Sequence, residues 1–249
     1  MSTITNKNYS GNELLIFTAT FNENGNIQRW YSQIRNELPA VAILVVDDNS
    51  FDGTNEFLCA MTKKDNNLVL HTRESKLGLG TAHLYAYRYA LEKKFARLIT
   101  MDADLSHLPS QLPRFLNSMN QSDFMIGTRW GDGSCNYKGI RKLLSYSANR
   151  IARIILKTGL TEYTSSYRSF TPMALATILD DFPRMDNYGF FIETIEILFQ
   201  NKISFSEVPI DFDDRTIGSS KIPNNQIFVS ALLLLRLAFY RTKNYWHKK

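Results

Sequence analysis

Short apolar runs alternate with longer helical segments through the first half of the sequence. In the longer segments apolar side chains recur three or four residues apart, which is the period of an amphipathic helix. This alternation is typical of a parallel sheet whose strands are joined by helical crossovers, so we expect an α/β fold. The apolar runs are Leu14–Phe17, Val41–Val46, Leu68–Leu70, Leu98–Met101 and Phe124–Ile126, and the helical segments are 24–38, a segment capped by Asp52, 81–93 and 109–119.

Composition excludes several other kinds of chain. With 44% hydrophobic and 21% charged residues over 249 positions, the chain has the apolar content of a globular protein. Its two cysteines are too few for a disulfide scaffold or a zinc site. The 29 Lys and Arg exceed the 24 Asp and Glu by five, which favours an anionic partner: a phosphate ligand, a nucleic acid or an anionic lipid.

Acidic side chains follow three of the expected strands. Asp47 and Asp48 come after the second strand, Asp102 and Asp104 after the fourth, and Glu23 shortly after the first. Ligands of such sheets bind beyond the carboxyl ends of the strands, so we expect these carboxylates at one edge. The pair Asp102 and Asp104 suits Mg²⁺ or Mn²⁺, which take oxygen ligands. Asp48 and Glu23 suit hydrogen bonds to a ribose or a base.

Three other candidate features give weaker evidence for a functional role. Residues 78–83 (GLGTAH) hold two glycines of a dinucleotide-binding turn, but His83 stands where the third small residue belongs and no strand leads directly into them. His107 is a candidate general base without a Ser or Cys nucleophile to serve, so a structural role is the preferred interpretation. A helix cap is the preferred interpretation of Asp52.

A basic amphipathic segment lies in the second half, after a flexible loop expected at 131–134. Ile140–Leu156 carries an apolar stripe at helical spacing, and its other face has Arg141, Lys142, Arg150 and Arg153 but no acid. Solvated helix faces ordinarily mix both signs of charge, because opposite charges one turn apart support the helix. Two interpretations therefore stay open: a solvated face, or a face turned toward an anion or a membrane.

Several motifs resemble one enzyme family. Residues 43–54 (ILVVDDNSFDGT) closely resemble the nucleotide-binding segment of family-2 glycosyltransferases, and Asp102-Ala103-Asp104 resembles their metal-binding D-x-D element. Within that family, three further stretches are similar to the polyprenyl-phosphate mannose synthases, also called dolichol-phosphate mannosyltransferases. They are 76–82 (KLGLGTA), 102–107 (DADLSH), and 207–210 (EVPI) followed by Asp214-Arg215 and Ser220-Lys221.

The resemblance implies a fold and a reaction. The fold is the GT-A (Rossmann-like) type, a mostly parallel sheet flanked by helices. One catalytic domain over residues 1–222 divides into a nucleotide-binding part, about 12–128, and an acceptor-binding part, about 129–222. Residues 223–249 then form an amphipathic helix with a basic tail. The reaction is transfer of mannose from GDP-mannose to a polyprenyl (dolichyl or undecaprenyl) monophosphate with inversion at the anomeric carbon.

The resemblance also assigns roles by position. The expected metal is Mg²⁺ or Mn²⁺, ligated by Asp104 and Ser106, and Phe190 and Glu193 fit the family with a less defined role. The expected catalytic residues are Asp102, Asp104, Arg129 and Arg215. The residues expected to bind the sugar nucleotide are Ala19, Phe21, Glu23, Val46, Asp48, Asp102, Ala103, Asp104, Ser106, Arg129, Arg215 and Lys221.

The chemistry of the acceptor agrees with the scarcity of candidate bases. An alcohol acceptor needs a base to remove its proton, whereas a lipid phosphate is already ionised and needs only to be positioned by cations. Planar guanidinium groups can hold phosphate oxygens by two hydrogen bonds. The cations proposed for this are Arg129, Arg141, Lys142, Arg168, Arg215 and Lys221.

The longest apolar stretch bears on the membrane. Ile227–Tyr240 has 14 residues, including Arg236. As a helix it would be ~21 Å long, short of the ~30 Å hydrocarbon core of a bilayer, so we expect it either in the membrane interface or packed on the protein. The first 11 residues are too polar for a signal peptide. The resemblance implies a peripheral protein on the cytoplasmic face, with room for a membrane partner subunit.

Three alternative functions remain. A related transferase would use UDP-glucose or another sugar nucleotide on the same lipid class, since Ala19 and Phe21 depart from the family's usual Pro and Tyr. A nucleic-acid-binding protein would fit the pI near 9.1 and the 12 tyrosines, but it predicts no acidic pocket, so no nucleic-acid partner is expected. A non-catalytic sensor would bind the sugar nucleotide without transferring the sugar.

Overall fold

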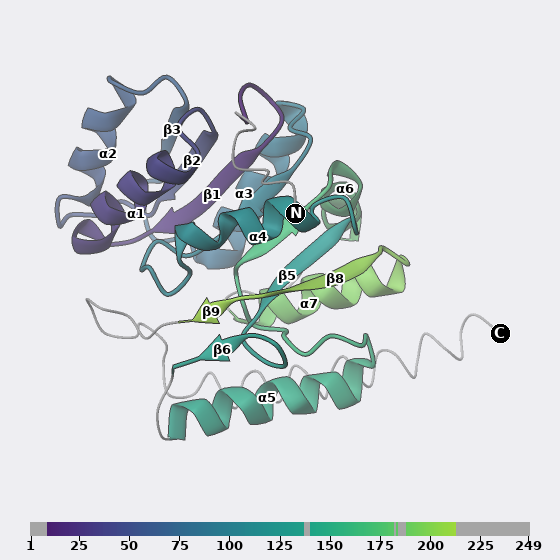
Figure 1. Cartoon of the computed structure of the whole chain (residues 1–249). Coiled ribbons are helices and arrows are strands. Elements are labelled where there is room, and N and C mark those ends of the chain that lie inside the picture. The colour runs from purple at the N-terminus through teal and green to yellow at the C-terminus, as the bar shows by residue number, and fades with distance from the viewer. Residues whose placement is uncertain (1–8, 137–139, 182, 184–187, 213–249) are drawn as a thin grey trace.

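Seven strands form the central sheet in the order β3-β2-β1-β4-β7-β5-β8 (Figure 1). The computed structural model describes residues 9–136, 140–181, 183 and 188–212, without the side chains of 140–144, 148 and 188. Paired strands run parallel except at β7, which is antiparallel to β4 and β5. The strands are β1 (Leu15–Thr20), β2 (Ala42–Asp47), β3 (Leu68–Thr72), β4 (Leu98–Thr100), β5 (Phe124–Thr128), β7 (Arg168–Phe170) and β8 (Phe205–Pro209), and a separate ladder pairs β6 (Ser134–Cys135) with β9 (Asp211–Phe212).

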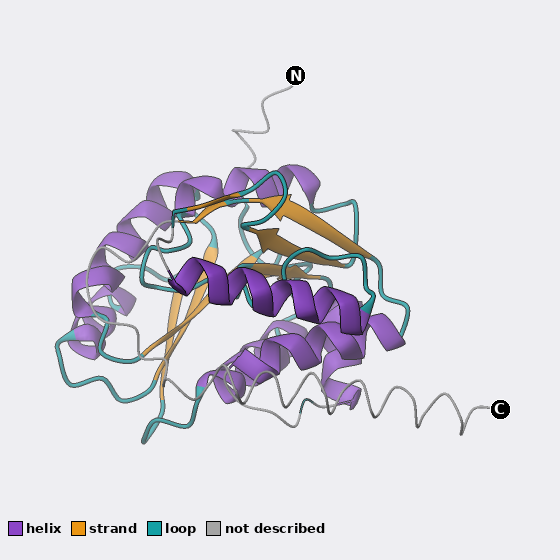
Figure 2. Cartoon of the chain, turned by 90° about the horizontal axis from the view of Figure 1, so that it is seen from below, coloured by secondary structure: helices purple, strands orange, loops and turns teal. Residues whose placement is uncertain are grey.

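Helices cover both faces of the sheet (Figure 2). Successive side chains of a strand point to opposite faces of the sheet, so an all-apolar strand contributes side chains to two hydrophobic cores. Leu44 and Val46 of β2 belong to one core with side chains of α3, α6 and α7, and Ile43 and Val45 belong to the other with side chains of α1, α2 and α4. The helices are α1 (Asn24–Glu37), α2 (Thr54–Thr62), α3 (Leu79–Glu92), α4 (Leu112–Ser118) after the 3₁₀ turn η1 (Pro109–Gln111), α5 (Ile140–Leu156), α6 (Pro172–Asp181) and α7 (Tyr188–Gln200).

The expected alternation of strands and helices is confirmed from β1 to β5. Two details of the helix starts differ from expectation. Asp52 is not the N-cap of α2, because Gly53 takes that position with a left-handed φ of 97°. Asp52 instead accepts hydrogen bonds from the backbone N and the hydroxyl of Thr54. Helix α3 begins at Leu79, two residues before the expected start.

The second half contains more regular structure than the sequence predicted. Strands β7 and β8 and helices α6 and α7 were not predicted, and Ser134, expected in a flexible loop, starts β6. The expected C-terminal helix over 223–249 lies outside the described residues. Among the helices described here, none is long and apolar enough to cross a membrane.

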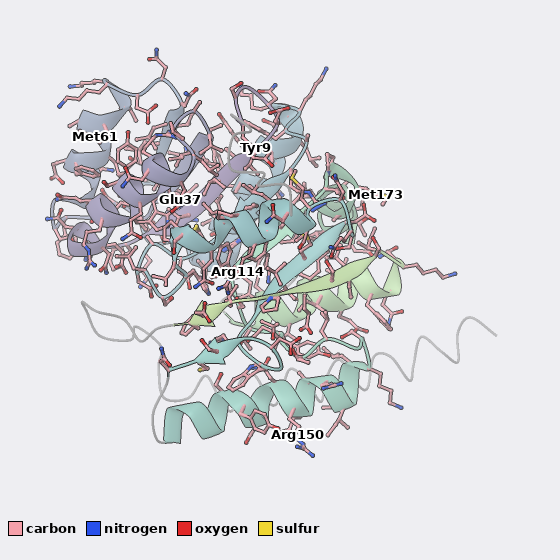
Figure 3. The ribbon with its side chains drawn as sticks, in the orientation of Figure 1. Tyr9, Glu37, Met61, Arg114, Arg150 and Met173 are labelled. Carbon is pink, nitrogen blue, oxygen red and sulfur yellow. The ribbon has the colours of Figure 1, made fainter. Side chains whose placement is uncertain are left out.

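Helix α5 lies at the border of the molecule, beyond β6 in Figure 1. Ala152 and Leu156 anchor it in the core, and the Oδ1 atom of Asn149 accepts a 2.8 Å hydrogen bond from the backbone N of Tyr163. Its opposite side is open, because Ile154 is 64% exposed and Arg150 projects away from the helix (Figure 3). The helix is therefore attached along one side and presents apolar and basic side chains on the other.

Candidate active site

The carboxyl ends of β1, β2, β4 and β5 lie at one edge of the sheet, as the acidic clusters predicted. Strands β1, β2 and β4 pair directly in parallel, and β5 has the same direction because both β4 and β5 run antiparallel to β7. The reversed direction of β7 brings the residues before it, Ser165 and Ser166, to the same edge. The sequence alone did not identify Ser166 as a residue of this site.

Asp47 closes the turn that follows β2. Its carboxylate accepts hydrogen bonds from the hydroxyl of Thr20 at 2.7 Å and from the backbone N and hydroxyl of Ser50 at 2.9 and 2.6 Å. The side chain of Asn55 adds a fourth at 3.1 Å. These contacts give Asp47 a structural role, so of the two adjacent acids Asp48 remains the one predicted to bind the ligand.

Asp48 is held by Arg73, the residue that directly follows β3. The Arg73 guanidinium forms a buried ion pair with Asp48 and also donates to the Thr81 hydroxyl at 2.6 Å and the Gly78 carbonyl at 3.0 Å. Burial raises the pKa of Asp48, while the Arg73 charge and hydrogen bond oppose the rise. Arg73 thus ties the expected nucleotide-binding acid to the start of α3.

The other expected nucleotide-binding residues lie around the ends of β1 and β2. Ala19 and Val46 are partners in the β1–β2 ladder. Phe21 is half-buried, and the Lys76 ammonium lies 4.5 Å from the centre of its ring. Glu23 precedes α1 and accepts a 2.8 Å hydrogen bond from the Asn26 side chain.

The D-x-D carboxylates follow β4 and are oriented by serines. Asp102 accepts a 2.6 Å hydrogen bond from the Ser166 hydroxyl. One oxygen of Asp104 accepts hydrogen bonds from both the backbone N and the hydroxyl of Ser106, at 3.0 and 2.6 Å. Leu105, between them, has a left-handed φ of 62°. Asp104 and Ser106 are buried, whereas the Asp102 side chain is 37% exposed.

This donor set fits a divalent cation shared with a diphosphate. Mg²⁺ commonly takes one or two protein carboxylates and completes its shell with phosphate oxygens and water. Within the described ranges, no three His, Cys, Asp or Glu side chains gather as a metal cage. The two carboxylates and the hydroxyl of Ser106 are hard oxygen donors of the kind that Mg²⁺ and Mn²⁺ select.

His107 is buried beside the D-x-D element, as its structural interpretation requires. Its Nδ1 atom lies 3.3 Å from the backbone N of Asp102, which donates to it, and its Nε2 atom lies 3.4 Å from the Ser165 hydroxyl. Burial lowers the pKa of His107, although the charges of Asp102 and Asp104 oppose the shift. A neutral imidazole therefore holds the loop that carries Asp102.

Arg129 follows β5 and forms a buried ion pair with Glu162. The Nε and Nη2 atoms of Arg129 lie 2.8 and 3.0 Å from the two carboxylate oxygens, and Nη2 also donates to the Thr164 hydroxyl at 2.8 Å. Burial raises the pKa of Glu162, but the Arg129 charge and the surrounding donors outweigh it, so the pKa lies below its usual range. Glu162 was missed because its partner is distant in sequence.

Arg168 is not available to a phosphate, so its expected role as an acceptor-binding cation is wrong. The side chain is fully buried, and burial lowers its pKa to about 10. It donates to backbone carbonyls of Ser165, Tyr163 and Phe191 and to the Thr194 hydroxyl. Phe190 is equally buried in the core. The side chains of Arg141 and Lys142, and all of Arg215 and Lys221, lie outside the description.

A groove of about 710 Å³ opens next to Arg129, between the following loop and α5. It combines aromatic and aliphatic side chains with three cations, and Trp130 meets Tyr146 across it with ring centres 5.3 Å apart. Such a lining suits an amphiphile with an anionic head. The lining residues are Trp130, Gly131, Tyr146, Asn149, Arg150, Arg153, Ile154, Lys157 and Thr161.

The sequence is similar to those of known glycosyltransferases. The family model described as glycosyl transferase family 2 matches residues 15–179. An undecaprenyl-phosphate mannosyltransferase of Micrococcus luteus is 33% identical over 84% of this chain and 87% of its own length. A polyprenol monophosphomannose synthase of Mycolicibacterium smegmatis is 35% identical over 86% of this chain and 82% of its own length.

Solved structures share the fold. Glucosyl-3-phosphoglycerate synthase from Mycobacterium tuberculosis, in complex with Mn²⁺, UDP and glucosyl-3-phosphoglycerate, aligns with a TM-score of 0.66 at 14% identity, over 93% of this chain and 80% of that one. Its complex with Mn²⁺, UDP-glucose and phosphoglyceric acid aligns with a TM-score of 0.65. This likeness establishes the GT-A fold alone. The match of the family model over residues 15–179 and the two relatives at 33% and 35% identity show that the chain belongs to glycosyltransferase family 2.

Proposed function

We propose that this chain transfers mannose from GDP-mannose to the phosphate of a polyprenyl monophosphate, with inversion at the anomeric carbon. One observation carries the proposal: the paired carboxylates of Asp102 and Asp104 follow β4 at the sheet edge where the loop after β5 borders a groove that is both cationic and apolar. The names of the two curated relatives support mannose as the sugar and a polyprenyl phosphate as the acceptor.

The donor is bound along the ends of β2, β1 and β4, within the nucleotide-binding part at about 12–128. Asp48, fixed by Arg73, and Glu23 offer hydrogen-bond acceptors to the nucleoside, with Ala19 and Val46 beneath it. Asp102, Ala103 and Asp104 meet the diphosphate. Asp104 and Ser106 would hold a Mg²⁺ or Mn²⁺ ion, and its charge would neutralise the departing diphosphate.

The acceptor enters through the groove beside α5, within the acceptor-binding part at about 129–222. Arg150, Arg153 and Lys157 attract the lipid phosphate, and Ile154 and Tyr146 contact the first part of the isoprenoid chain. Arg129, held in place by Glu162 and next in sequence to Trp130 of the groove, is proposed to direct the phosphate toward the sugar. Arg215 and Lys221 are proposed to complete the phosphate contacts.

The reaction needs no general base. A phosphate oxygen forms a bond to the anomeric carbon from the side opposite the leaving group, while the bond from that carbon to the diphosphate breaks. The diphosphate leaves with the electron pair, and no proton is transferred, because the lipid phosphate is already ionised. This agrees with the buried position of His107, whose ring nitrogens are both engaged within the protein.

The open side of α5 is proposed to face the membrane that holds the acceptor. Exposed Ile151 and Ile154 alternate there with Arg150 and Arg153, the composition of a surface that enters the headgroup region. The basic tail at 223–249 is proposed to reinforce this attachment. The protein would then be peripheral, on the cytoplasmic face, with or without a membrane partner subunit.

A transfer assay tests the proposal. The protein is incubated with polyprenyl-phosphate vesicles, Mn²⁺ and labelled GDP-mannose or labelled UDP-glucose, and the lipid is extracted into organic solvent. We expect label in the organic phase from GDP-mannose alone. Label from UDP-glucose would replace the donor assignment with the alternative one. Nucleotide binding without any labelled lipid from either donor would indicate the non-catalytic sensor.

A further inference from the structure

Phe51 is the most exposed large hydrophobic side chain of the part of the chain described here, at 79% exposure. It lies four residues beyond the end of β2, next to the expected nucleotide site. It lies within residues 43–54, the segment that resembles the family's nucleotide-binding stretch, but it is not among the residues to which the resemblance assigns a contact. An aromatic ring left in water beside a ligand site is a candidate contact surface for that ligand.

The backbone that carries Phe51 is fixed, so its exposure is a defined feature of the site. The backbone N of Phe51 donates to the side-chain oxygen of Asn22 at 3.0 Å, and the backbone N of Asn22 donates to the Ser50 hydroxyl at 2.8 Å. Asn22 adopts a left-handed φ of 55°, which turns the loop after β1 toward the loop after β2. The two loops are therefore tied to each other at this point.

Phe51 belongs to a group formed by three neighbouring loops. Its ring meets that of Phe21 edge to face, with ring centres 6.2 Å apart and planes at 79°. Lys76, from the loop after β3, contacts the Phe21 ring at 4.5 Å. The loops after β1, β2 and β3 thus contribute two aromatic rings and one cation at the same end of the site.

The strand order places this aromatic group to one side of the D-x-D element. Asp104 follows β4, and the order β3-β2-β1-β4 places the group of Phe21, Phe51 and Lys76 on one side of it. Neighbouring strands lie ~4.8 Å apart, so β2 and β4 are separated by roughly 10 Å. A nucleoside diphosphate with its phosphates at Asp104 and its nucleoside at Asp48 and Glu23, the acids that follow β2 and β1, carries its base toward Phe51.

We propose that Phe51 is a stacking surface for the nucleobase of the sugar-nucleotide donor. The inference rests on the proposed function only in that the ligand is a nucleoside diphosphate. Every base has a π face, so the ring contributes affinity for the base without selecting guanine over uracil. Phe21 buttresses the ring, and Lys76 places a cation near the carbonyl oxygens of the base.

The test measures nucleotide binding by calorimetry, which separates this inference from the transfer reaction. The full chain with Mn²⁺ is titrated with GDP, with UDP and with inorganic diphosphate, which lacks a base. We expect Phe51→Ala to weaken GDP and UDP about 10-fold and to leave diphosphate unchanged, and Phe51→Trp to keep the affinity for both nucleotides. Met173→Ala on α6 is the matched control and should bind as the unsubstituted protein does, because this exposed apolar residue follows β7 at the edge of the sheet opposite the site.

Three results would overturn the inference. In the first, Phe51→Ala binds GDP as tightly as the unsubstituted protein. In the second, it loses GDP and diphosphate in parallel, which indicates a distorted phosphate site. In the third, its nucleotide affinity is unchanged but its sedimentation with anionic vesicles is reduced, which makes Phe51 a membrane contact. An unsubstituted protein that binds GDP but transfers no mannose would refute the proposed function and leave the stacking test valid.

Discussion

The two halves of the candidate site are built in different ways. On the donor side, short loops after β1 and β2 are tied by hydrogen bonds between neighbouring loops, such as those of Asn22 with Ser50 and Phe51. On the acceptor side, Arg129 depends on Glu162, 33 residues away, and the groove depends on the attachment of α5. We therefore expect a substitution on the donor side to change ligand binding, and the loss of a buried contact on the acceptor side to change the stability of the fold.

The largest effect is expected from breaking the buried Arg129–Glu162 pair. Glu162→Ala removes a fully buried carboxylate that compensates the Arg129 charge, and we expect a loss of about 3–5 kcal/mol in the free energy of unfolding, measured with urea. Arg114→Ala is the control, because the Arg114–Asp211 pair is half-exposed and should be worth under ~1 kcal/mol. Equal losses in both variants would contradict the distinction between the two pairs.

On the donor side, Arg73→Gln should act on the ligand. Without Arg73, only the charge of Lys76 still opposes the effect of burial on Asp48, so the pKa of Asp48 rises further and the carboxylate is protonated earlier as pH falls. We expect about a 10-fold higher donor KM at pH 7, increasing toward pH 5, with kcat little changed. Lys64→Gln, an exposed cation beyond α2, is the control. A donor KM equal to that of Lys64→Gln at both pH values would contradict a positioning role for Arg73.

His83 in the core beneath the site should make stability depend on pH. Burial, followed by the charge of Arg168, lowers its pKa to about 3 from an ordinary 6.5. The unfolded chain therefore takes up this proton first, and the free energy of unfolding should fall as pH drops below 6.5, by up to ~1.4 kcal/mol per pH unit. His83→Phe should reduce that slope in urea titrations between pH 6.5 and 4.5. An unchanged slope would show that other groups cause the acid sensitivity.

The smallest effects are expected at the groove. Arg150→Ala or Arg153→Ala removes an exposed cation, so we expect a three- to fivefold higher KM for the polyprenyl phosphate, an unchanged donor KM, and a smaller dependence on salt. The Lys64→Gln variant again serves as the control. A change in the donor KM alone would move these cations out of the acceptor site.

The same contrast explains what could be predicted from the sequence. The β2 run and Asp47-Asp48 are adjacent in sequence, so the strand, its edge and its acids could be predicted together. Strand β7 escaped prediction because it is three residues long and begins with Arg168, whose burial depends on acceptors such as the Phe191 carbonyl. Glu162 escaped for the same reason: only the fold brings it to Arg129.

Arg73 is an intermediate case. It follows β3 directly, and a cation at a strand end could have been paired with Asp48 once β3 and β2 were taken as neighbours. The groove could be predicted only in part. The basic face of Ile140–Leu156 could be recognised in the sequence, but the contact of Tyr146 on that helix with Trp130 depends on how α5 packs.

The most direct measurement is mannose transfer by Asp104→Asn under limiting Mn²⁺, compared with the unsubstituted protein and with Ser106→Ala. If Asp104 holds the cation at the diphosphate, Asp104→Asn should lose at least ~100-fold in kcat/KM, and Ser106→Ala about 10-fold in apparent metal affinity, recoverable at higher Mn²⁺. Labelled polyprenyl-phosphate mannose formed by Asp104→Asn at the unsubstituted rate would contradict the account.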